Sequence, residues 1–224
     1  MRSAPTSTVT TNSCSTYFTD LKIQKRNLHF PNSYNSGPVG MVLVMSVGNI
    51  TDVFQDRFPQ WLRLAYKGGG EIYHPYDLNM PLTIPRRPRS HFINDSPLTE
   101  HGKIIAESIG RGLSHEDLLP YVIYTAPDLR SVQTATAIAR ALRCTYTTIR
   151  IEPSLVDWCN WRESEDSRHF LSPKNFFYLG YPIDVKYQPV LPVDDVIKRT
   201  EHPAEFYERV AEFIGRTIAS CEDR

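Results

Sequence analysis

Cysteine is scarce in this sequence: the 224 residues include only Cys14, Cys144, Cys159 and Cys221. No two of them form a Cys-x-x-Cys pair, and the seven histidines form no His-x-His or His-x-x-x-His pair. The spacing therefore excludes a disulfide framework and gives no support to a zinc site. We expect neither a metal nor another cofactor.

An excess of one charge is also lacking, because 25 basic and 25 acidic side chains balance at neutral pH. Domains that hold a nucleic-acid backbone are usually clearly basic, so nucleic acid is not an expected partner. No apolar run approaches the roughly 20 residues that cross a bilayer, so no membrane partner is expected. The first residues have no apolar segment typical of a secretory signal, and the cytoplasm is the expected location.

Two regions differ in character. Residues 1–38 are polar, rich in Ser and Thr, and without apolar periodicity, which predicts a disordered leader. Residues 39–224 are predicted to form one domain.

Apolar runs and helical periodicity alternate along that domain. Short runs predict buried strands over 41–46, 121–126 and 147–152. The first of three predicted helices is capped by Thr99 and has Ile104, Ile105, Ile109 and Leu113 on one face. The second is capped by Asp128 and runs to residue 142. The third begins at Pro203, and its apolar stripe consists of Phe206, Val210, Phe213, Ile214 and Ile218. Strands that alternate with helices predict an α/β fold with a mostly parallel sheet flanked by helices.

Two proline-rich stretches interrupt this pattern. Residues 73–97 contain five prolines and residues 159–202 contain four, which predicts irregular excursions over the core.

Ligands on parallel sheets bind beyond the carboxyl ends of the strands. No P-loop, Gly-x-Gly-x-x-Gly or Gly-x-Ser-x-Gly motif follows any predicted strand. The second strand is instead followed by Ala126-Pro-Asp-Leu-Arg-Ser-Val-Gln-Thr-Ala135. Arg130 would lie in the first helical turn there, where a guanidinium suits phosphate oxygens.

That string resembles the signature of the histidine phosphatase (phosphoglycerate mutase-like) superfamily, and more narrowly the phosphatase domain of the Sts/TULA group. The resemblance runs from about Val42 to the C-terminus. Other pieces carry it in order: Val53-Phe54, Trp61, Asp77–Pro81, Pro85–Arg87, Asp95–Gly102, Ile149–Trp158 and Trp161.

The resemblance implies phosphoryl transfer to a histidine of an Arg-His-Gly motif that closes the first strand. Here it places Ser46 at the first arginine of that motif, Val47 at the nucleophilic histidine and Ile50 at a second arginine. Valine has no lone pair to attack phosphorus, and no histidine occurs between His29 and His74. The nucleophile is therefore expected to be missing.

Other positions match the family pattern. Arg130 matches the phosphate-binding arginine of the helix, and Asp157 matches the acid that protonates the leaving oxygen. Arg87 matches a basic loop position and is a weaker phosphate-binding candidate. The chain ends at Arg224, before the strand that carries the family's second histidine. We therefore expect the C-terminal part of the family fold to be lacking. Three outcomes stay open: the two strands that flank the missing one close together, another segment or another chain of a homo- or hetero-oligomer completes the sheet, or the fold is only marginally stable.

These patterns favour a catalytically inactive histidine phosphatase-like protein with a binding or regulatory role. Its expected partner is a phosphorylated protein or a small phosphate ligand. Two alternatives stay open: an active phosphomonoester or phosphotyrosine phosphatase with a non-standard nucleophile such as Cys159, and an interaction module that uses the Pro-rich Pro85–Pro88.

Overall fold

The computed structural model describes residues 60–66, 72–157, 169–197 and 201–222, all within the compact unit Leu43–Arg224. The predicted leader, 1–38, and the predicted first strand, 41–46, lie outside the described residues.

The sheet of the described part consists of two parallel strands, β1 (Val122–Thr125) and β2 (Thr148–Ile151). Val122 lies opposite Thr148, and Thr125 lies opposite Ile151. Each strand is one residue shorter at both ends than the run that predicted it. The parallel pairing confirms the predicted α/β class.

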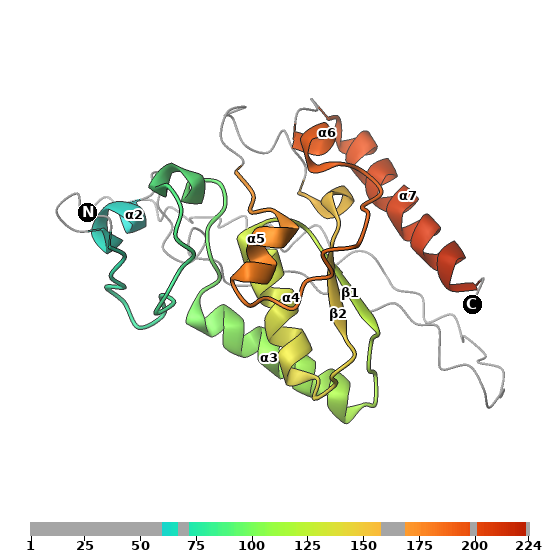
Figure 1. Ribbon diagram of the computed structural model, residues 1–224, viewed down its shortest axis with the longest axis horizontal. Helices are drawn as coiled ribbons and strands as arrows, with labels where there is room; N and C mark the ends of the chain where they lie inside the picture. The colour runs from blue at the N-terminus through green and yellow to red at the C-terminus, as the bar shows by residue number, and fades with distance from the viewer. Residues whose placement is uncertain (1–59, 67–71, 158–168, 198–200, 223–224) are drawn as a thin grey trace, which may run out of the picture. The chain divides into compact units, whose positions relative to one another are not determined.

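Helix α4 (Leu129–Ala141) follows β1 and packs against both strands, as Figure 1 shows. The Asp128 side chain accepts a hydrogen bond from the Ser131 amide at 3.1 Å, which confirms the predicted N-cap. Such a cap contributes about 1 kcal/mol because it satisfies an amide that has no partner within the helix. The cap thus fixes where the helix begins, directly beyond the carboxyl end of β1.

Helix α3 (Glu100–His115) packs along α4 and begins at the predicted cap, Thr99, which accepts from the Gly102 amide at 2.9 Å. The prediction of its buried face was partly wrong, because Ile104 is exposed. The buried residues are instead Gly102, Ala106 and Gly110. A Cβ at Gly110 would lie 2.5 Å from the Ile138 carbonyl oxygen, so the two helices approach too closely there for a larger side chain.

Helix α7 (Pro203–Glu222) confirms the predicted C-terminal helix and packs against the short 3₁₀ helix η4 (Pro153–Leu155). Phe213 is buried on its inner face, whereas Ile218 of the predicted stripe is exposed. The inner face also buries the charged side chain of Arg209.

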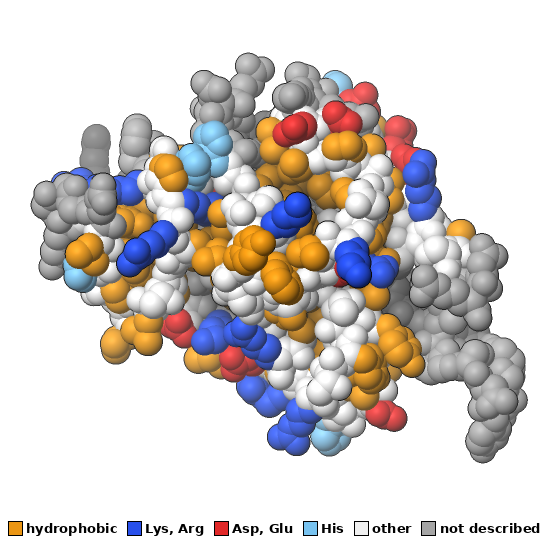
Figure 2. Space-filling model, in the orientation of Figure 1, with side chains coloured by type: hydrophobic (Ala, Val, Ile, Leu, Met, Phe, Trp, Pro, Cys, Tyr) orange, Lys and Arg blue, Asp and Glu red, His pale blue; other side chains and the backbone are white. Residues whose placement is uncertain are grey.

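The stretch predicted to be irregular between 159 and 202 contains two short helices, α5 (Pro173–Tyr178) and α6 (Val193–Ile197). Ser172 caps α5, and α6 packs against η4. Figure 2 shows hydrophobic side chains gathered over α5, where Phe177, Tyr178 and Leu179 are exposed.

The earlier Pro-rich stretch has one regular element among its described residues, the 3₁₀ helix η3 (Arg89–Phe92). Before it lies α2 (Gln60–Ala65). These segments contribute Trp61, Met80 and Phe92 to the main core, where they join Leu129, Ile149 and Phe176 from α4, β2 and α5. In the part of the chain that the structure describes, no helix has the length and apolar character of a membrane span.

Candidate functional site

Arg130 lies in the first turn of α4, at the carboxyl edge of the sheet. Its side chain is 17% exposed, and its Nε lies 3.2 Å from Oδ2 of Asp128, the residue that caps the helix. Its Nη2 also pairs with Oδ2 of Asp157. The guanidinium therefore lies between two carboxylates, both of which must be considered when an anion approaches.

Asp157 reaches Arg130 from the end of β2, through η4. Its side chain is 73% exposed, so it can rotate away without disturbing the core. The structure thus brings together two predicted site residues that lie 27 positions apart in the sequence. The convergence of parallel strand ends at one edge of the sheet explains the meeting.

Buried Glu152 holds the backbone between β2 and Asp157. One of its carboxylate oxygens accepts from the Ser154 amide at 2.9 Å, and the other accepts from the Tyr187 hydroxyl at 2.6 Å and the Val190 amide at 2.9 Å. Burial and the hydrogen bond to Glu152 raise the pKa of Tyr187. This network ties η4 to the segment after α5.

Arg209 of α7 supports the same backbone from the other side. Its guanidinium donates to the carbonyls of Ser154 at 2.6 Å and Val156 at 3.1 Å, and forms a two-pronged ion pair with Glu201 at 2.7 and 2.9 Å. Both side chains of the pair are 2% exposed. Arg209 therefore holds the segment that ends at Asp157.

Arg209 was not among the predicted site residues, although its position in the sequence carries a signal. Arg209 lies three residues after Phe206 and four before Phe213, so helical spacing places it on the apolar stripe of α7. A charged residue on a buried face requires a partner, and Glu201 lies just before the helix.

Arg87, the weaker phosphate-binding candidate, has a buried side chain that is paired with Asp95. Its side chain is 4% exposed, and Nη1 lies 2.6 Å from Oδ2 of Asp95. Nη2 donates to the Asp95 carbonyl at 2.6 Å, and the guanidinium lies over the Phe92 ring. In the structure Arg87 is thus a buried partner of Asp95.

Asp95 in turn holds the start of α4, because its Oδ1 accepts from the Leu129 amide at 2.6 Å. Burial raises the pKa of Asp95 to about 6, although the charge of Arg87 and the Leu129 amide act in the opposite direction. Arg87 and Asp95 therefore support the helix end from which Arg130 extends.

The remaining predicted positions, Ser46, Val47 and Ile50, lie outside the described residues, as does Cys159. Within the described ranges no three His, Cys, Asp or Glu side chains are grouped closely enough to hold a metal ion.

Comparison with known proteins places this arrangement in a family. The family model of the histidine phosphatase superfamily (branch 1) matches residues 86–224, which include both Arg130 and Asp157. The chain belongs to this superfamily. The match covers the whole described site.

Among curated members, the mouse ubiquitin-associated and SH3 domain-containing protein A is 31% identical over 189 residues, which are 81% of this chain and 29% of that protein. The ecdysteroid-phosphate phosphatase of Drosophila melanogaster is 33% identical over 156 residues, 68% of this chain and 20% of that protein. The chain thus spans less than a third of the length of either relative.

A solved histidine phosphatase relative has the same fold. The crystal structure of the ecdysone phosphate phosphatase from Bombix mori in complex with tungstate matches with a TM-score of 0.69 and 24% identity. The match covers 79% of this chain and 65% of that one. It shows that the described elements follow the α/β fold of the superfamily.

Proposed function

We propose that this chain binds phosphorylated ligands through Arg130 and does not hydrolyse them. The observation that carries the proposal is the position of Arg130, a guanidinium at the carboxyl edge of a parallel sheet beside an exposed Asp157. Several relatives are named as phosphatases, so a phosphate group is the ligand to expect.

The absence of hydrolysis rests on the sequence. The resemblance places Val47 where the family has its nucleophilic histidine, and no histidine occurs between His29 and His74. Loss of the nucleophile in an enzyme that works through a covalent intermediate typically lowers turnover by about a million-fold. The retained Asp157 could protonate a leaving oxygen, but there would be no attacking group to make it leave.

The anion must be held mainly by the guanidinium. The Leu129 amide at the start of α4 already donates to Asp95, and the Ser131 amide donates to Asp128. The helix end thus has few donors left for a ligand. Two of the guanidinium nitrogens face Asp128 and Asp157, so a phosphate must displace Asp157 to form its own pair.

The competition between Asp157 and a phosphate for Arg130 allows an experiment to distinguish a binding protein from an enzyme. In an enzyme, Asp157→Asn removes the general acid and slows turnover. In a binding protein the same substitution removes a competing negative charge, so phosphate binding becomes tighter. Because Asp157 is largely exposed, its pair with Arg130 contributes at most about 1 kcal/mol, which corresponds to about a threefold to fivefold gain in affinity.

The test is isothermal titration of the purified chain and its variants with inorganic phosphate. We expect Asp157→Asn to bind more tightly and Arg130→Gln to lose binding. Arg140→Gln, on the exposed side of the same helix, and Glu212→Gln, an exposed carboxylate on α7, serve as matched controls and should bind as the parent does. Phosphate binding that is unaffected by Arg130→Gln, or weakened by Asp157→Asn, would contradict the proposal.

The interaction-module alternative has less support. Pro85 is buried, and the Arg87 side chain is bound to Asp95. A groove that recognises Pro-x-x-Pro segments needs the prolines exposed in an extended chain, so this segment is poorly placed for it.

A further inference from the structure

Helix α5 ends in a turn that determines which of its aromatic side chains are buried. The Gly180 amide donates to the Phe177 carbonyl at 2.9 Å, and the Tyr181 amide donates to the Phe176 carbonyl at 3.1 Å. Gly180 has a φ of 85°, and the rings of Phe176 and Tyr181 pack edge to face with their centroids 5.4 Å apart. The two bonds, the left-handed glycine and the ring contact constitute a Schellman motif. The motif holds Phe176 in the core and leaves the next three residues on the outer side.

Those three residues, Phe177, Tyr178 and Leu179, form an exposed apolar patch, which we call the α5 patch. Their exposed fractions are 52%, 84% and 48%. Figure 2 shows this hydrophobic surface over α5, with Lys and Arg side chains around it. A side chain as exposed as Tyr178 projects from the surface and does not line a groove. Because backbone hydrogen bonds close the turn, the patch projects in a defined direction.

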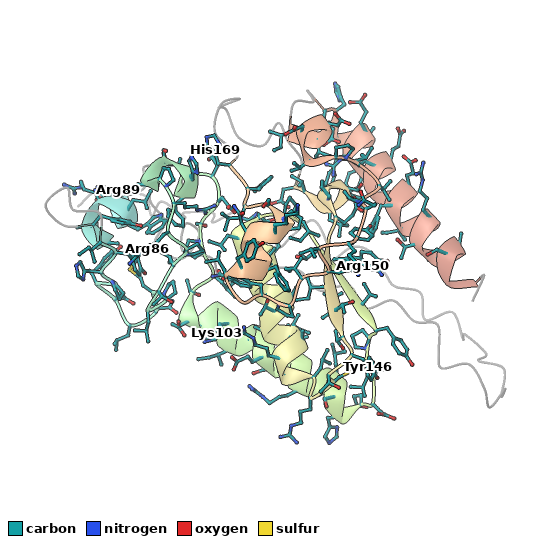
Figure 3. The ribbon with its side chains drawn as sticks, viewed as in Figure 1. Arg86, Arg89, Lys103, Tyr146, Arg150 and His169 are labelled. Carbon is teal, nitrogen blue, oxygen red and sulfur yellow. The ribbon has the colours of Figure 1, made fainter. Side chains whose placement is uncertain are left out.

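Basic side chains accompany the α5 patch. Lys174 lies in α5 itself, Lys186 follows the turn in the chain, and both are exposed. No ion pair within the described residues involves either lysine. Figure 3 labels Arg150 to the right of α5, where Asp184 pairs with it at 3.1 Å. Asp184 is the one acid between residues 169 and 188, so no carboxylate of this stretch is left to neutralise the two lysines.

We propose that the α5 patch binds the surface of a membrane that contains anionic lipids. Phe177, Tyr178 and Leu179 enter the boundary between headgroups and acyl chains, and Lys174 and Lys186 face the lipid phosphates. The expectation of no membrane partner followed from the lack of a spanning run, which a surface contact does not need. The inference goes beyond phosphate binding at Arg130, because no residue of the patch belongs to that site.

The shape and charge of the patch favour a lipid surface over another protein. A protein partner needs a pocket for each projecting side chain, whereas a fluid headgroup layer accommodates them without one. An aromatic ring with a polar tip, such as Tyr178, partitions to the membrane interface. The net charge of the chain is zero, so attraction to an anionic surface must come from cations gathered on one face, as Lys174 and Lys186 are beside the patch.

The experiment is co-sedimentation of the full chain with vesicles of two compositions. One consists of phosphatidylcholine alone, and the other of phosphatidylcholine and phosphatidylserine in equal parts. We expect the chain to sediment with the mixed vesicles and to bind the neutral ones at least roughly tenfold more weakly, because both lysines then lose their attraction to anionic lipid. Added salt should weaken binding to the mixed vesicles, since the charges are exposed.

Variants locate the contact. Tyr178→Ser should weaken binding to the mixed vesicles by roughly tenfold, and Lys174→Gln and Lys186→Gln by roughly fivefold each. All three side chains are exposed, so these variants should fold as the parent does. Two exposed residues of α7 provide the matched controls, Tyr207→Ser for the aromatic and Arg216→Gln for a cation. Both should bind within about twofold of the parent, because no contact to lipid is removed.

Three results would overturn the inference: no sedimentation with the mixed vesicles, equal affinity for the two compositions, or unchanged affinity in Tyr178→Ser and the two lysine variants. Sedimentation velocity without lipid tests another occupant, since self-association that Tyr178→Ser abolishes would assign the patch to a second copy of the chain. Loss of vesicle binding in Arg130→Gln would assign the lipid phosphate to the phosphate site and also overturn the inference. Failure of inorganic phosphate to bind at Arg130 would leave the vesicle result unaffected, so the two proposals are tested separately.

Discussion

The pair formed by Arg209 and Glu201 gives the sharpest stability prediction. Substitution Arg209→Met keeps most of the length of the side chain and removes the guanidinium. Glu201, whose side chain is 2% exposed, then loses its cationic partner, and the carbonyls of Ser154 and Val156 lose their donor. The variant thus tests whether Arg209 of α7 stabilises the backbone segment that ends at Asp157.

The expected loss is large. Breaking a buried ion pair by removing one member costs about 3–5 kcal/mol, and each buried carbonyl that loses its donor adds about 1 kcal/mol or more. Against the 5–15 kcal/mol that stabilises typical domains, Arg209→Met should lower the free energy of unfolding by about 4 kcal/mol or more.

Urea denaturation followed by circular dichroism measures this loss, and the chain offers a matched control on the same helix. Arg216 pairs with Glu212 at 2.6 Å, but both side chains are more than half exposed, so Arg216→Met should cost less than about 1 kcal/mol. The double variant Arg209→Met, Glu201→Leu should recover part of the loss, because it removes the buried charge as well. Equal losses in the two single variants would refute the reasoning.

Two further predictions concern the helices and the support of Arg130. Gly110→Ala places a methyl group against the Ile138 carbonyl and should destabilise the domain by about 1–3 kcal/mol. Gly112→Ala meets no atom within 4 Å and should stabilise the domain by about 0.5–1 kcal/mol. Thermal unfolding of both variants measures the two changes in stability. A Gly110→Ala variant as stable as Gly112→Ala would contradict the close approach of α3 and α4. Because the pKa of Asp95 is raised from 3.8 to about 6 in the folded chain, folding takes up a proton in that window, and this contribution to the free energy of unfolding increases as the pH falls from 6 towards 4. Asp95→Asn should lose this part of the pH dependence, and an identical slope in both proteins would contradict it.

Local patterns predicted those elements that are determined locally. Thr99 and Asp128 are caps in the structure as the sequence indicated, and the apolar runs around β1 and β2 lie where expected. The short helices α5 and α6 were missed because five or six residues carry too little periodicity to stand out among prolines. Their formation depends on packing against segments distant in the sequence.

The exposure of Ile104 has a similar cause. Hydropathy alone favours isoleucine for a buried face, but the close approach of α3 to α4 selects Gly102, Ala106 and Gly110 instead. Only the tertiary structure reveals that small side chains are required there.

The meeting of Arg130 and Asp157 could be anticipated, because both follow parallel strands whose carboxyl ends share one edge of the sheet. The burial of Arg87 could not be derived from a charge pattern alone, and that of Arg209 was indicated only by its place on the apolar stripe of α7. Each depends on an acid eight residues away, Asp95 and Glu201 respectively, and on the backbone groups that meet it in the folded chain.

The central claim, that Arg130 binds a phosphate group that the chain does not cleave, is tested most directly by ³¹P NMR of phenyl phosphate in the presence of the protein. One spectrum reports both binding, as broadening of the ester signal, and hydrolysis, as a new signal of inorganic phosphate. We predict broadening that disappears in Arg130→Gln and no inorganic phosphate signal above that of a protein-free sample. Inorganic phosphate that accumulates with the parent chain and not with Arg130→Gln would contradict the claim, as would an ester signal that the parent chain leaves unchanged.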